Sequence, residues 1–380
     1  MTSIAKYLIL SLPQSTNAQG WLQNELNGGK TNLYKLNLQD FQSGTLDSLV
    51  QESEELSKID TQLSSSVSKV IDILNNVTDS NQSKTRIINN QSIYDYIERF
   101  NWNSSKYRLD KPISQLVSII SNEAVAFDND VRAAYQTYQT AKSNFLAADR
   151  KKNGDLSIKS LHEIVKPEQF VLNSEHLITI LIAVPKNLVD DWNSHYETLT
   201  EFVIPRSSEL IASDSEYSLF SVTLFKKYQN DFINASRERK WHPRNDFQYN
   251  EEILNNLRKE FDLTKQTEFK LKNDLIRLSK TAYSDIFQAW LHIKIIRVYV
   301  ESVLRYGLPP QFNYYLIKFD QANLKNLSKS RKELIDKFGY LGGSGSDDKK
   351  SSTATNSLQE YASLVDTEYE PFVLYEIDIV

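Results

Sequence analysis

The sequence contains no cysteine among its 380 residues, which excludes disulfide bonds, thiol catalysis and zinc sites built on cysteine. No run of apolar residues reaches the roughly eighteen that a membrane-spanning helix needs. The apolar stretch at residues 7–12 is also too short for the hydrophobic region of a signal peptide. We therefore expect a soluble, cytosolic protein with no direct membrane insertion.

Histidine is scarce too, and its spacing argues against a metal centre. None of the five histidines has another one three or four residues away, as a metal-binding pair on a helix requires. They are His162, His176, His195, His242 and His292. His176 falls in an alternating apolar pattern, which favours a buried, hydrogen-bonded side chain in a strand. We expect no metal and no cofactor.

Two further motifs of enzymes are missing. Without a G-x-S-x-G motif, no serine nucleophile is indicated. The segment LNGGKT, residues 26–31, ends like a phosphate-binding loop, but the first glycine of that motif would have to replace Asn24. The residues before it also have a helical pattern, whereas the motif follows a strand. A glycine turn is the simpler interpretation, and a nucleotide switch is the alternative.

The formal net charge of −5 argues against a protein that binds nucleic acid over its whole surface. Its acidic residues occur as neighbours, whereas a catalytic pair needs two opposed carboxyl groups in a partly buried cleft. The three groups are Glu52, Glu54 and Glu55; Asp190 and Asp191; and Asp366, Glu368 and Glu370. The last group lies beside an apolar C-terminal segment and could instead form a rim that faces a partner protein.

Long helical periodicity is the main feature that the sequence does contain. Apolar residues recur every three or four positions through residues 46–77, and Thr45 is placed to cap that helix. The same spacing runs from Pro112 to Ala148, which predicts a helix of about 37 residues, roughly 55 Å long. A second long pattern at residues 253–304 predicts a partner helix that packs antiparallel to it.

Short apolar runs predict strands at both ends of the chain and in its middle. The runs at the two ends, within residues 6–13 and 370–380, are expected to share one sheet. In the middle, strands are predicted within residues 168–185, 203–205 and 216–225, and helices within 186–202 and 226–241.

This pattern predicts an α+β, helix-rich and elongated fold in which a smaller domain is inserted between two long helices. We expect a discontinuous foot domain at residues 1–120 and 290–380. A helical neck at residues 121–151 and 250–289 would join it to a head domain at residues 152–249.

The segment HIKIIRVYVESVLRYGLPPQF, residues 292–312, combines a histidine, cations and aromatics in a helix that ends at Gly307. Such a composition could line an active site, or it could form a seam between distant parts of the chain. Because this helix returns the chain from the head to the foot, we interpret it as a seam.

The densest positive charge lies in FKKYQNDFINASRERKWHPR, residues 225–244. Only Asp231 and Glu238 oppose its cations, and four aromatic residues are interleaved with them. The cations are Lys226, Lys227, Arg237, Arg239, Lys240 and Arg244. Three interpretations remain open: an amphipathic helix that packs its aromatics on a sheet, a basic face for an acidic protein partner, and a nucleic-acid surface.

Five blocks of the sequence resemble the C subunit of the vacuolar-type proton-translocating ATPase (V-ATPase), in its fungal form. They are LDSLVQESEELSKID (46–60), RKKNGDLSIKSLHEIVKPEQFVLNSEHL (150–177), HIKIIRVYVESVLRYGLPPQF (292–312), ELIDKFGYLGG (333–343) and QEYASLVDTEYEPFVLYEIDIV (359–380). The blocks keep their order over nearly the whole chain, and departures are confined to residues 14–20 and 344–356.

The resemblance implies a non-catalytic stator subunit with a foot, a neck and a head. It implies a clamp on two peripheral stalks, each made of the E and G subunits, and a contact with the cytosolic N-terminal domain of the large membrane-embedded a subunit. It further implies control of reversible assembly, and hence of ATP-driven proton transport and organelle acidification. The protein would lie on the cytosolic face of the vacuolar membrane, or free in the cytosol after disassembly.

Separately from the resemblance, the charge pattern leads us to two expectations about partner-binding residues. We expect Lys226, Lys227, Arg237, Arg239 and Lys240 to attract an acidic stalk face, and Asp366, Glu368 and Glu370 to lie on the contact rim of the foot. The alternative function is a stand-alone adaptor that binds acidic polymers or the cytoskeleton through the basic aromatic helix.

Overall fold

The computed structural model describes residues 5–29, 32–38, 40–78, 86–161, 164–171, 174–245, 251–320, 323–342 and 371–379. The chain divides into two compact units. We call Met1–Ala133 with Leu275–Val380 the terminal unit, and Ala134–Asp274 the inserted unit. Helices make up 59% and strands 19%, so the predicted helix-rich α+β class is confirmed. The finer division into foot, neck and head stays a prediction.

The helix predicted after Thr45 is α2, Leu46–Val77. The Thr45 side chain accepts a hydrogen bond from the backbone N–H of Ser48 at 3.3 Å, which satisfies one of the free donors at the helix start. A stripe of buried side chains holds α2 on the core, and its members are Leu49, Leu56, Leu63, Val70, Ile71 and Leu74. The apolar spacing in the sequence therefore indicated both the start and the buried face of this helix.

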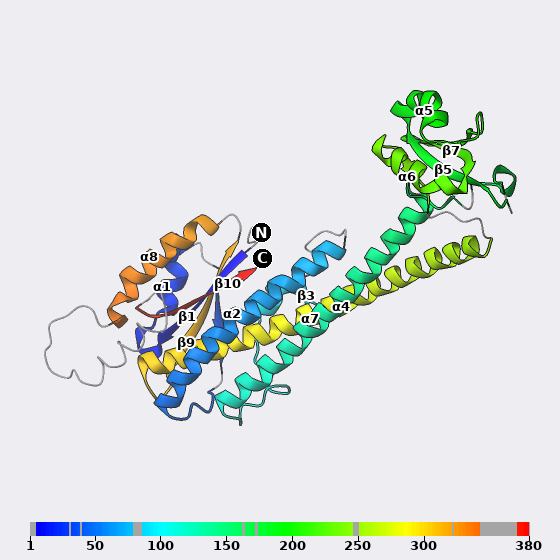
Figure 1. Ribbon diagram of the computed structural model, residues 1–380. Helices are drawn as coiled ribbons and strands as arrows, with labels where there is room; N and C mark the ends of the chain where they lie inside the picture. Colours follow the sequence, from blue (N-terminus) through cyan, green and yellow to red (C-terminus); the bar gives the residue numbers. More distant parts are fainter. Residues whose placement is uncertain are drawn as a thin grey trace. The chain divides into compact units, whose positions relative to one another are not determined.

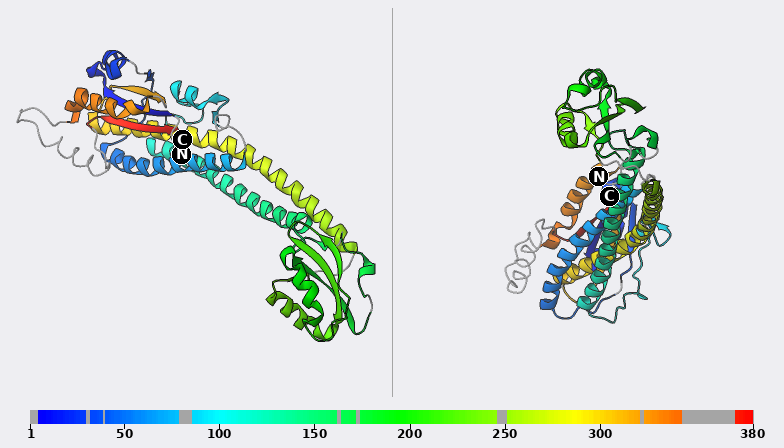
Figure 2. Two further views of the ribbon diagram at one scale, coloured as in Figure 1. Left: turned by 90° about the horizontal axis from the view of Figure 1, so that it is seen from above. Right: turned by 45° about the vertical axis from the view of Figure 1, so that its right-hand side comes forward.

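The two longest helices, α4 (Ile113–Asn153) and α7 (Glu251–Tyr306), both extend past the C-terminal ends predicted for them. They run side by side and antiparallel in Figures 1 and 2. In the inserted unit the ring centroids of Phe145 and Phe261 are 5.8 Å apart. In the terminal unit both helices contribute to one core. Within the described part of the chain, no helix has the length and apolarity to cross a membrane.

The sheet of the terminal unit has four antiparallel strands in the order β10-β1-β9-β2. Their bounds are Ala5–Pro13 for β1, Asn32–Leu36 for β2, Phe312–Asp320 for β9 and Val373–Ile379 for β10. Ala5 lies opposite Ile379, which confirms that the strands at the two ends share a sheet. The ends of the chain accordingly meet in both views of Figure 2.

Helices cover both faces of this sheet (Figure 1). One face carries α1 (Gln19–Asn24) and α8 (Leu327–Phe338), whose apolar side chains form a small core with it. The other face packs on the large core that α2, α4 and α7 share. Alternate residues of each strand point to opposite faces, so the almost continuous apolar sequence of β1 is explained by burial on both sides.

The end of α7 joins strands from the two ends of the chain, as the seam interpretation predicts. The Tyr306 hydroxyl donates to the backbone oxygen of Ser11 in β1 at 2.9 Å and accepts from the backbone N–H of Val373 in β10 at 3.1 Å. One turn earlier, the Ser302 hydroxyl bonds that of Ser11 at 2.7 Å. Gly307 then ends the helix with φ +86°, a left-handed conformation that favours glycine.

Between α2 and α4 lie short elements that the sequence analysis did not identify. A small hairpin, β3 (Ile87–Ile88) with β4 (Gln91–Ser92), is followed by the short helix α3 (Ile93–Glu98). Elements of two and six residues are too short for periodicity to reveal.

The inserted unit contains a second antiparallel sheet, in the order β6-β7-β5-β8. Its bounds are Leu177–Pro185 for β5, Glu209–Ser213 for β6, Tyr217–Phe225 for β7 and His242–Pro243 for β8. The strands β5 and β7 confirm the predictions, whereas β6 and β8 were missed. Of the third predicted strand, residues 203–205, only Val203 makes a bridge, to Leu224.

Each central strand of this sheet is followed by a 3₁₀ turn and a helix. After β5 come Lys186–Leu188 and α5 (Val189–His195), and after β7 come Lys226–Tyr228 and α6 (Gln229–Glu238). Both helices are shorter than predicted. Figure 1 shows α5 and α6 next to the sheet that contains β5 and β7. Their Trp192 and Phe232 are fully buried against the sheet.

Candidate functional site

The five cations expected to bind a partner are all exposed on the inserted unit, where they surround α6. They are Lys226, Lys227, Arg237, Arg239 and Lys240. The helix separates them into two groups, because its ten residues span roughly 15 Å. Lys226 and Lys227 lie at its N-terminal end and the other three at its C-terminal end, so the structure does not gather all five in one cluster.

The C-terminal group has a structural explanation. Arg237 lies in the last turn of α6, where a cation is favoured by the helix dipole. Arg239 pairs with Asp191 at 3.1 Å, and its guanidinium lies 5.5 Å from the centre of the Trp241 ring. Lys240 has φ +62° and ends the turn that follows the helix. Of the five cations, Arg239 alone has an ion pair with a described residue.

The N-terminal pair lacks such an explanation, because cations at a helix N-terminus oppose the dipole. The Lys226 ammonium donates to the backbone oxygen of Ser174 at 2.6 Å, and Lys227 lies over the Tyr228 ring at 5.6 Å. Neither lysine has a carboxylate partner among the described residues. This end of α6 therefore presents positive charge that no described carboxylate neutralises.

Arg244 does not belong to this surface, although the sequence grouped it with the other cations. Its side chain is 5% exposed and donates to the backbone oxygens of Leu156 at 2.7 Å and Lys159 at 2.8 Å. It holds the segment after α4 onto the sheet. The arginine was misassigned because its carbonyl partners lie more than eighty residues away in the chain.

The four aromatic residues of the basic segment fall into two groups that differ in their contacts. Phe232 and Trp241 are buried with Trp192 in the core of the inserted unit, as the amphipathic-helix interpretation predicts. Phe225 and Tyr228 instead contact Phe202, which the sequence analysis did not single out. Phe202 is 56% exposed, and nothing in the surrounding sequence distinguishes it from an ordinary loop residue.

The acidic residues expected on the rim of the foot, Asp366, Glu368 and Glu370, lie outside the described residues. The other two groups of neighbouring acids lie on α2 and in the first turn of α5. Glu54 and Glu55 are exposed, and Glu52 is half-buried, where burial and the nearby Glu55 raise the pKa of its carboxyl. Asp190 is exposed and Asp191 pairs with Arg239, as described above.

A buried carboxylate that the sequence analysis missed joins α2 to α7. Asp60 accepts hydrogen bonds from the indole of Trp290 at 2.7 Å, the ammonium of Lys294 at 2.8 Å and the guanidinium of Arg297 at 2.8 Å. All four side chains are less than a tenth exposed. A carboxylate so fully occupied by donors has no room for a substrate, so this cluster holds the seam together.

The sequence analysis predicted burial for His176, but the buried histidine is His292. His176 is exposed just before β5, whereas His292 on α7 is 1% exposed. Rings of Phe100, Trp102 and Tyr107 pack within about 5 Å of it. This burial lowers the pKa of His292 to about 4, so the imidazole is neutral at physiological pH.

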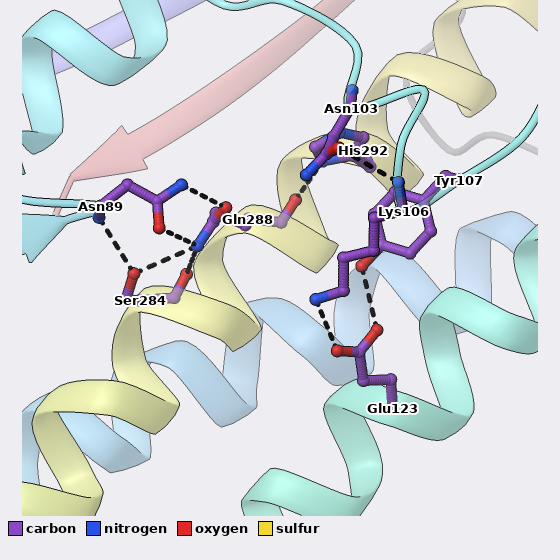
Figure 3. Close-up of polar contacts among 8 residues, drawn as sticks. All are labelled: Asn89, Asn103, Lys106, Tyr107, Glu123, Ser284, Gln288 and His292. Carbon is purple, nitrogen blue, oxygen red and sulfur yellow. Dashed lines mark hydrogen bonds and ion pairs between the residues drawn. The ribbon is translucent and has the colours of Figure 1, made fainter.

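Figure 3 shows how His292 and its neighbours attach residues 86–110 to α7. His292 Nδ1 lies 2.7 Å from the backbone oxygen of Gln288, and Nε2 accepts from the backbone N–H of Asn103 at 3.3 Å. One turn back, the Gln288 side chain exchanges hydrogen bonds with Asn89. Both ring nitrogens of His292 have a partner, which indicates a structural histidine rather than a general base or metal ligand.

Metal and nucleotide chemistry find no support among the described residues. No three histidine or acidic side chains there are close enough to hold a metal ion. The glycines of LNGGKT lie in a 3₁₀ turn, Leu26–Gly29, that follows α1 rather than a strand. The lysine and threonine of that segment, at positions 30 and 31, lie outside the described residues.

Comparison with known proteins identifies relatives over almost the whole chain. A family described as the V-ATPase C subunit matches residues 7–373. The C subunit of the V-type proton ATPase of Saccharomyces cerevisiae is 50% identical over 386 residues, which cover 98% of this chain and 97% of the yeast protein. The C 1-A subunit of the V-type proton ATPase of Danio rerio is 39% identical over 349 residues, 90% of this chain and 89% of the fish protein.

Among solved structures, the cytoplasmic N-terminal domain of the V-ATPase I subunit, a homolog of the a subunit, aligns with 89% of this chain and 98% of its own. Its TM-score is 0.32 and its identity 12%. A likeness this weak carries no argument about fold or partners.

Proposed function

Because the chain belongs to the V-ATPase C subunit family, whose members are non-catalytic subunits of a proton-transporting ATPase, we propose that it is a stator subunit that clamps peripheral stalks. In this proposal it binds two stalks, each a heterodimer of the E and G subunits. It also contacts the cytosolic N-terminal domain of the a subunit. The complex would hold it at the cytosolic face of the vacuolar membrane.

The observation that carries the proposal is the exposed positive charge at the N-terminal end of α6. Lys226 and Lys227 are held at fixed positions by the turn after β7, and neither is neutralised by a described carboxylate. Exposed charges of this kind raise the association rate with an oppositely charged partner and select against like-charged ones. An acidic stalk surface is the partner that this arrangement favours.

The fold supplies two features that a clamp needs. Each unit has its own sheet and its own core, so each can present a separate binding surface. Two moderate contacts on one chain act at high effective concentration, which gives firm assembly that can still be released one contact at a time. Stepwise release of this kind fits control of reversible assembly, and hence of ATP-driven proton transport and organelle acidification.

For the terminal unit we propose that Asp366, Glu368 and Glu370 lie on the rim that meets a second stalk or the a subunit. In the sequence these acids shortly precede β10, which is an edge strand of the sheet. An acidic rim on one unit and a basic surface on the other would direct the two units to different partners.

The test is a calorimetric titration of the full chain with a reconstituted E–G heterodimer. Reversal of three charges, with Lys226, Lys227 and Arg237 all changed to Glu, should weaken binding by roughly 3- to 150-fold, since exposed ion pairs contribute about 0.2–1 kcal/mol each. It should also flatten the dependence of affinity on salt.

The matched control reverses three exposed lysines on the helices of the same unit, Lys142, Lys265 and Lys270. It changes the net charge equally and should leave both affinity and salt slope close to those of the parent chain. If the two triple variants behave alike, the basic surface is not the stalk-binding site. Binding of the parent chain and the control to polyanions instead of E–G, with loss of that binding when Lys226, Lys227 and Arg237 are reversed, would favour the adaptor alternative.

A further inference from the structure

Three aromatic side chains form a cluster at the N-terminal end of α6, in which Phe202 and Phe225 are exposed and Tyr228 is half-buried. The Phe202 ring stacks on Tyr228 with centroids 5.0 Å apart and meets Phe225 edge-on at 5.7 Å. Phe202 is 56% and Phe225 37% exposed, although large apolar side chains in contact usually share a buried core. We call Phe202, Phe225 and Tyr228 the aromatic platform.

The backbone that presents the platform is strained. Phe202 has φ +60° and Arg206 has φ +57°, left-handed conformations that are uncommon for bulky residues. Such strain persists only where the surroundings enforce it, and it concentrates at functional sites. Here the strained backbone accompanies an exposed phenylalanine ring, that of Phe202.

Hydrogen bonds fix this loop to β7. The backbone N–H of Phe225 donates to the Phe202 oxygen at 3.3 Å, and that of Ile204 donates to the Thr223 oxygen at 3.0 Å. Glu197 accepts from the backbone N–H of Arg206 at 2.8 Å. The platform is therefore preorganised, so a partner that binds it does not have to order the loop first.

The charges beside the platform indicate the chemistry of its partner. The Lys227 ammonium lies 5.6 Å from the centre of the Tyr228 ring, and Lys226 precedes it in the same turn. The exposed acids Glu201, next to Phe202, and Asp231, in the first turn of α6, belong to the same region, but no described carboxylate pairs with either lysine. A partner that covers the rings thus gains from acidic residues at its edge.

The edge of β7 next to the platform is already occupied, because Val203 pairs there with Leu224. A partner cannot add a strand at that position and has to bind through side chains. An amphipathic helix does this by placing apolar residues at three- and four-residue spacing on the rings.

From these observations we infer that the aromatic platform is the docking site for an acidic amphipathic helix of a partner subunit. This inference rests on the proposed function, since it names the contact surface and partner chemistry of the same basic end of α6. Burial of Phe202 by the helix supplies apolar contact, and Lys226 and Lys227 pair with acids that flank its apolar stripe.

The first arm of the test titrates variants of the full chain with the E–G heterodimer. Phe202→Gly removes the ring and also relieves the strained backbone, so it separates binding from folding. We expect at least roughly tenfold weaker binding with an unfolding midpoint that is unchanged or higher. Leu210→Ala, which truncates an apolar residue 55% exposed on β6, is the control and should bind within about twofold of the parent chain.

Two charge-reversal variants complete this arm of the test. Lys227→Glu should also weaken binding, whereas Lys186→Glu should not. Lys186 is an exposed lysine in the matching 3₁₀ turn after β5, and the antiparallel pairing of β5 with β7 puts it at the opposite end of the sheet. Parent-like binding by both Phe202→Gly and Lys227→Glu would overturn the inference.

The second arm identifies the partner without assuming that it is E–G. The photo-reactive p-benzoylphenylalanine replaces Phe202, or Leu210 as a control, in the full chain assembled into the V-ATPase, and cross-linked segments are read by mass spectrometry. A cross-link specific to position 202 on an acidic amphipathic helix supports the inference, even if that helix belongs to a different protein of the complex and the E–G proposal fails. No cross-link above the Leu210 control, or one to a segment of different chemistry, would overturn it.

Discussion

Replacement of the buried carboxylate of Asp60 tests the seam between α2 and α7 most severely. Asp60→Asn keeps the shape of the side chain but removes the charge that faces Lys294 and Arg297, and it turns an NH₂ group toward at least one donor. Loss of one partner from a buried ion pair costs roughly 3–5 kcal/mol, because the remaining charges stay buried and uncompensated. Because three donors lie within 2.8 Å of the carboxylate, we expect Asp60→Asn to lower the free energy of unfolding by an amount in this range.

The control is Glu55→Gln on the same helix. Glu55 is exposed, so its change from acid to amide should alter stability by no more than about 0.5 kcal/mol. Both variants carry the same change of net charge and the same change of chemical group. Their difference therefore isolates the contribution of burial.

Hydrogen exchange of the full chain is the appropriate assay, since the two units need not unfold together. Amides in the middle of α2 should exchange roughly 100-fold faster or more in Asp60→Asn than in the parent chain, while amides of β5 and β7 keep their rates. Protection of α2 within about threefold of the Glu55→Gln variant would show that the Asp60 cluster does not hold the seam.

Two further predictions concern pH and a helix end. Because burial lowers the pKa of His292 to about 4, the unfolded chain takes up a proton first as pH falls. The folded terminal unit should therefore lose up to roughly 3 kcal/mol between about pH 6.5 and pH 4, as urea unfolding would measure. His292→Gln should lack this part of the slope, and a slope equal to that of the parent chain would contradict the assignment. Gly307→Ala places a side chain on a residue with φ +86° and should lower stability by about 1 kcal/mol in thermal unfolding. Gly20→Ala in α1, where no atom lies within 4 Å of the added methyl group, should be neutral or stabilising. Equal unfolding midpoints for the two variants would count against the strain argument.

The long elements of this fold could be predicted because their signal is repeated many times in the sequence. The stripe of α2 recurs over about nine turns, and Thr45 marks its start by ordinary capping chemistry. The strand β1 was recognisable by its dense apolar run. By contrast, β6 is an edge strand with exposed residues and a register shift, so its sequence carries no clear alternation.

The candidate site could be predicted only in its charges. Exposure of Lys226 and Lys227 follows from their type, but their separation from Arg237 depends on the length of α6. Phe202 belongs to the aromatic platform because of its left-handed backbone conformation and its contact with Phe225. Neither property can be predicted from the neighbouring residues in the sequence.

The buried polar clusters could not be predicted either, because their members lie far apart in the sequence. Asp60 meets Trp290 across 230 positions of the chain, so pairwise spacing gives no hint of the contact. His292 and His176 both lie in apolar stretches of the sequence, and only the packing of distant aromatic rings decides that His292 is the buried one.

A clamp has to hold two stalks with one chain, and mass photometry of the full chain with excess E–G heterodimer measures that stoichiometry. We expect a complex of one chain with two heterodimers, and a complex with only one when Lys226, Lys227 and Arg237 are reversed to Glu. A complex that never exceeds one heterodimer per chain for the parent protein, or no complex at all, would contradict the clamp.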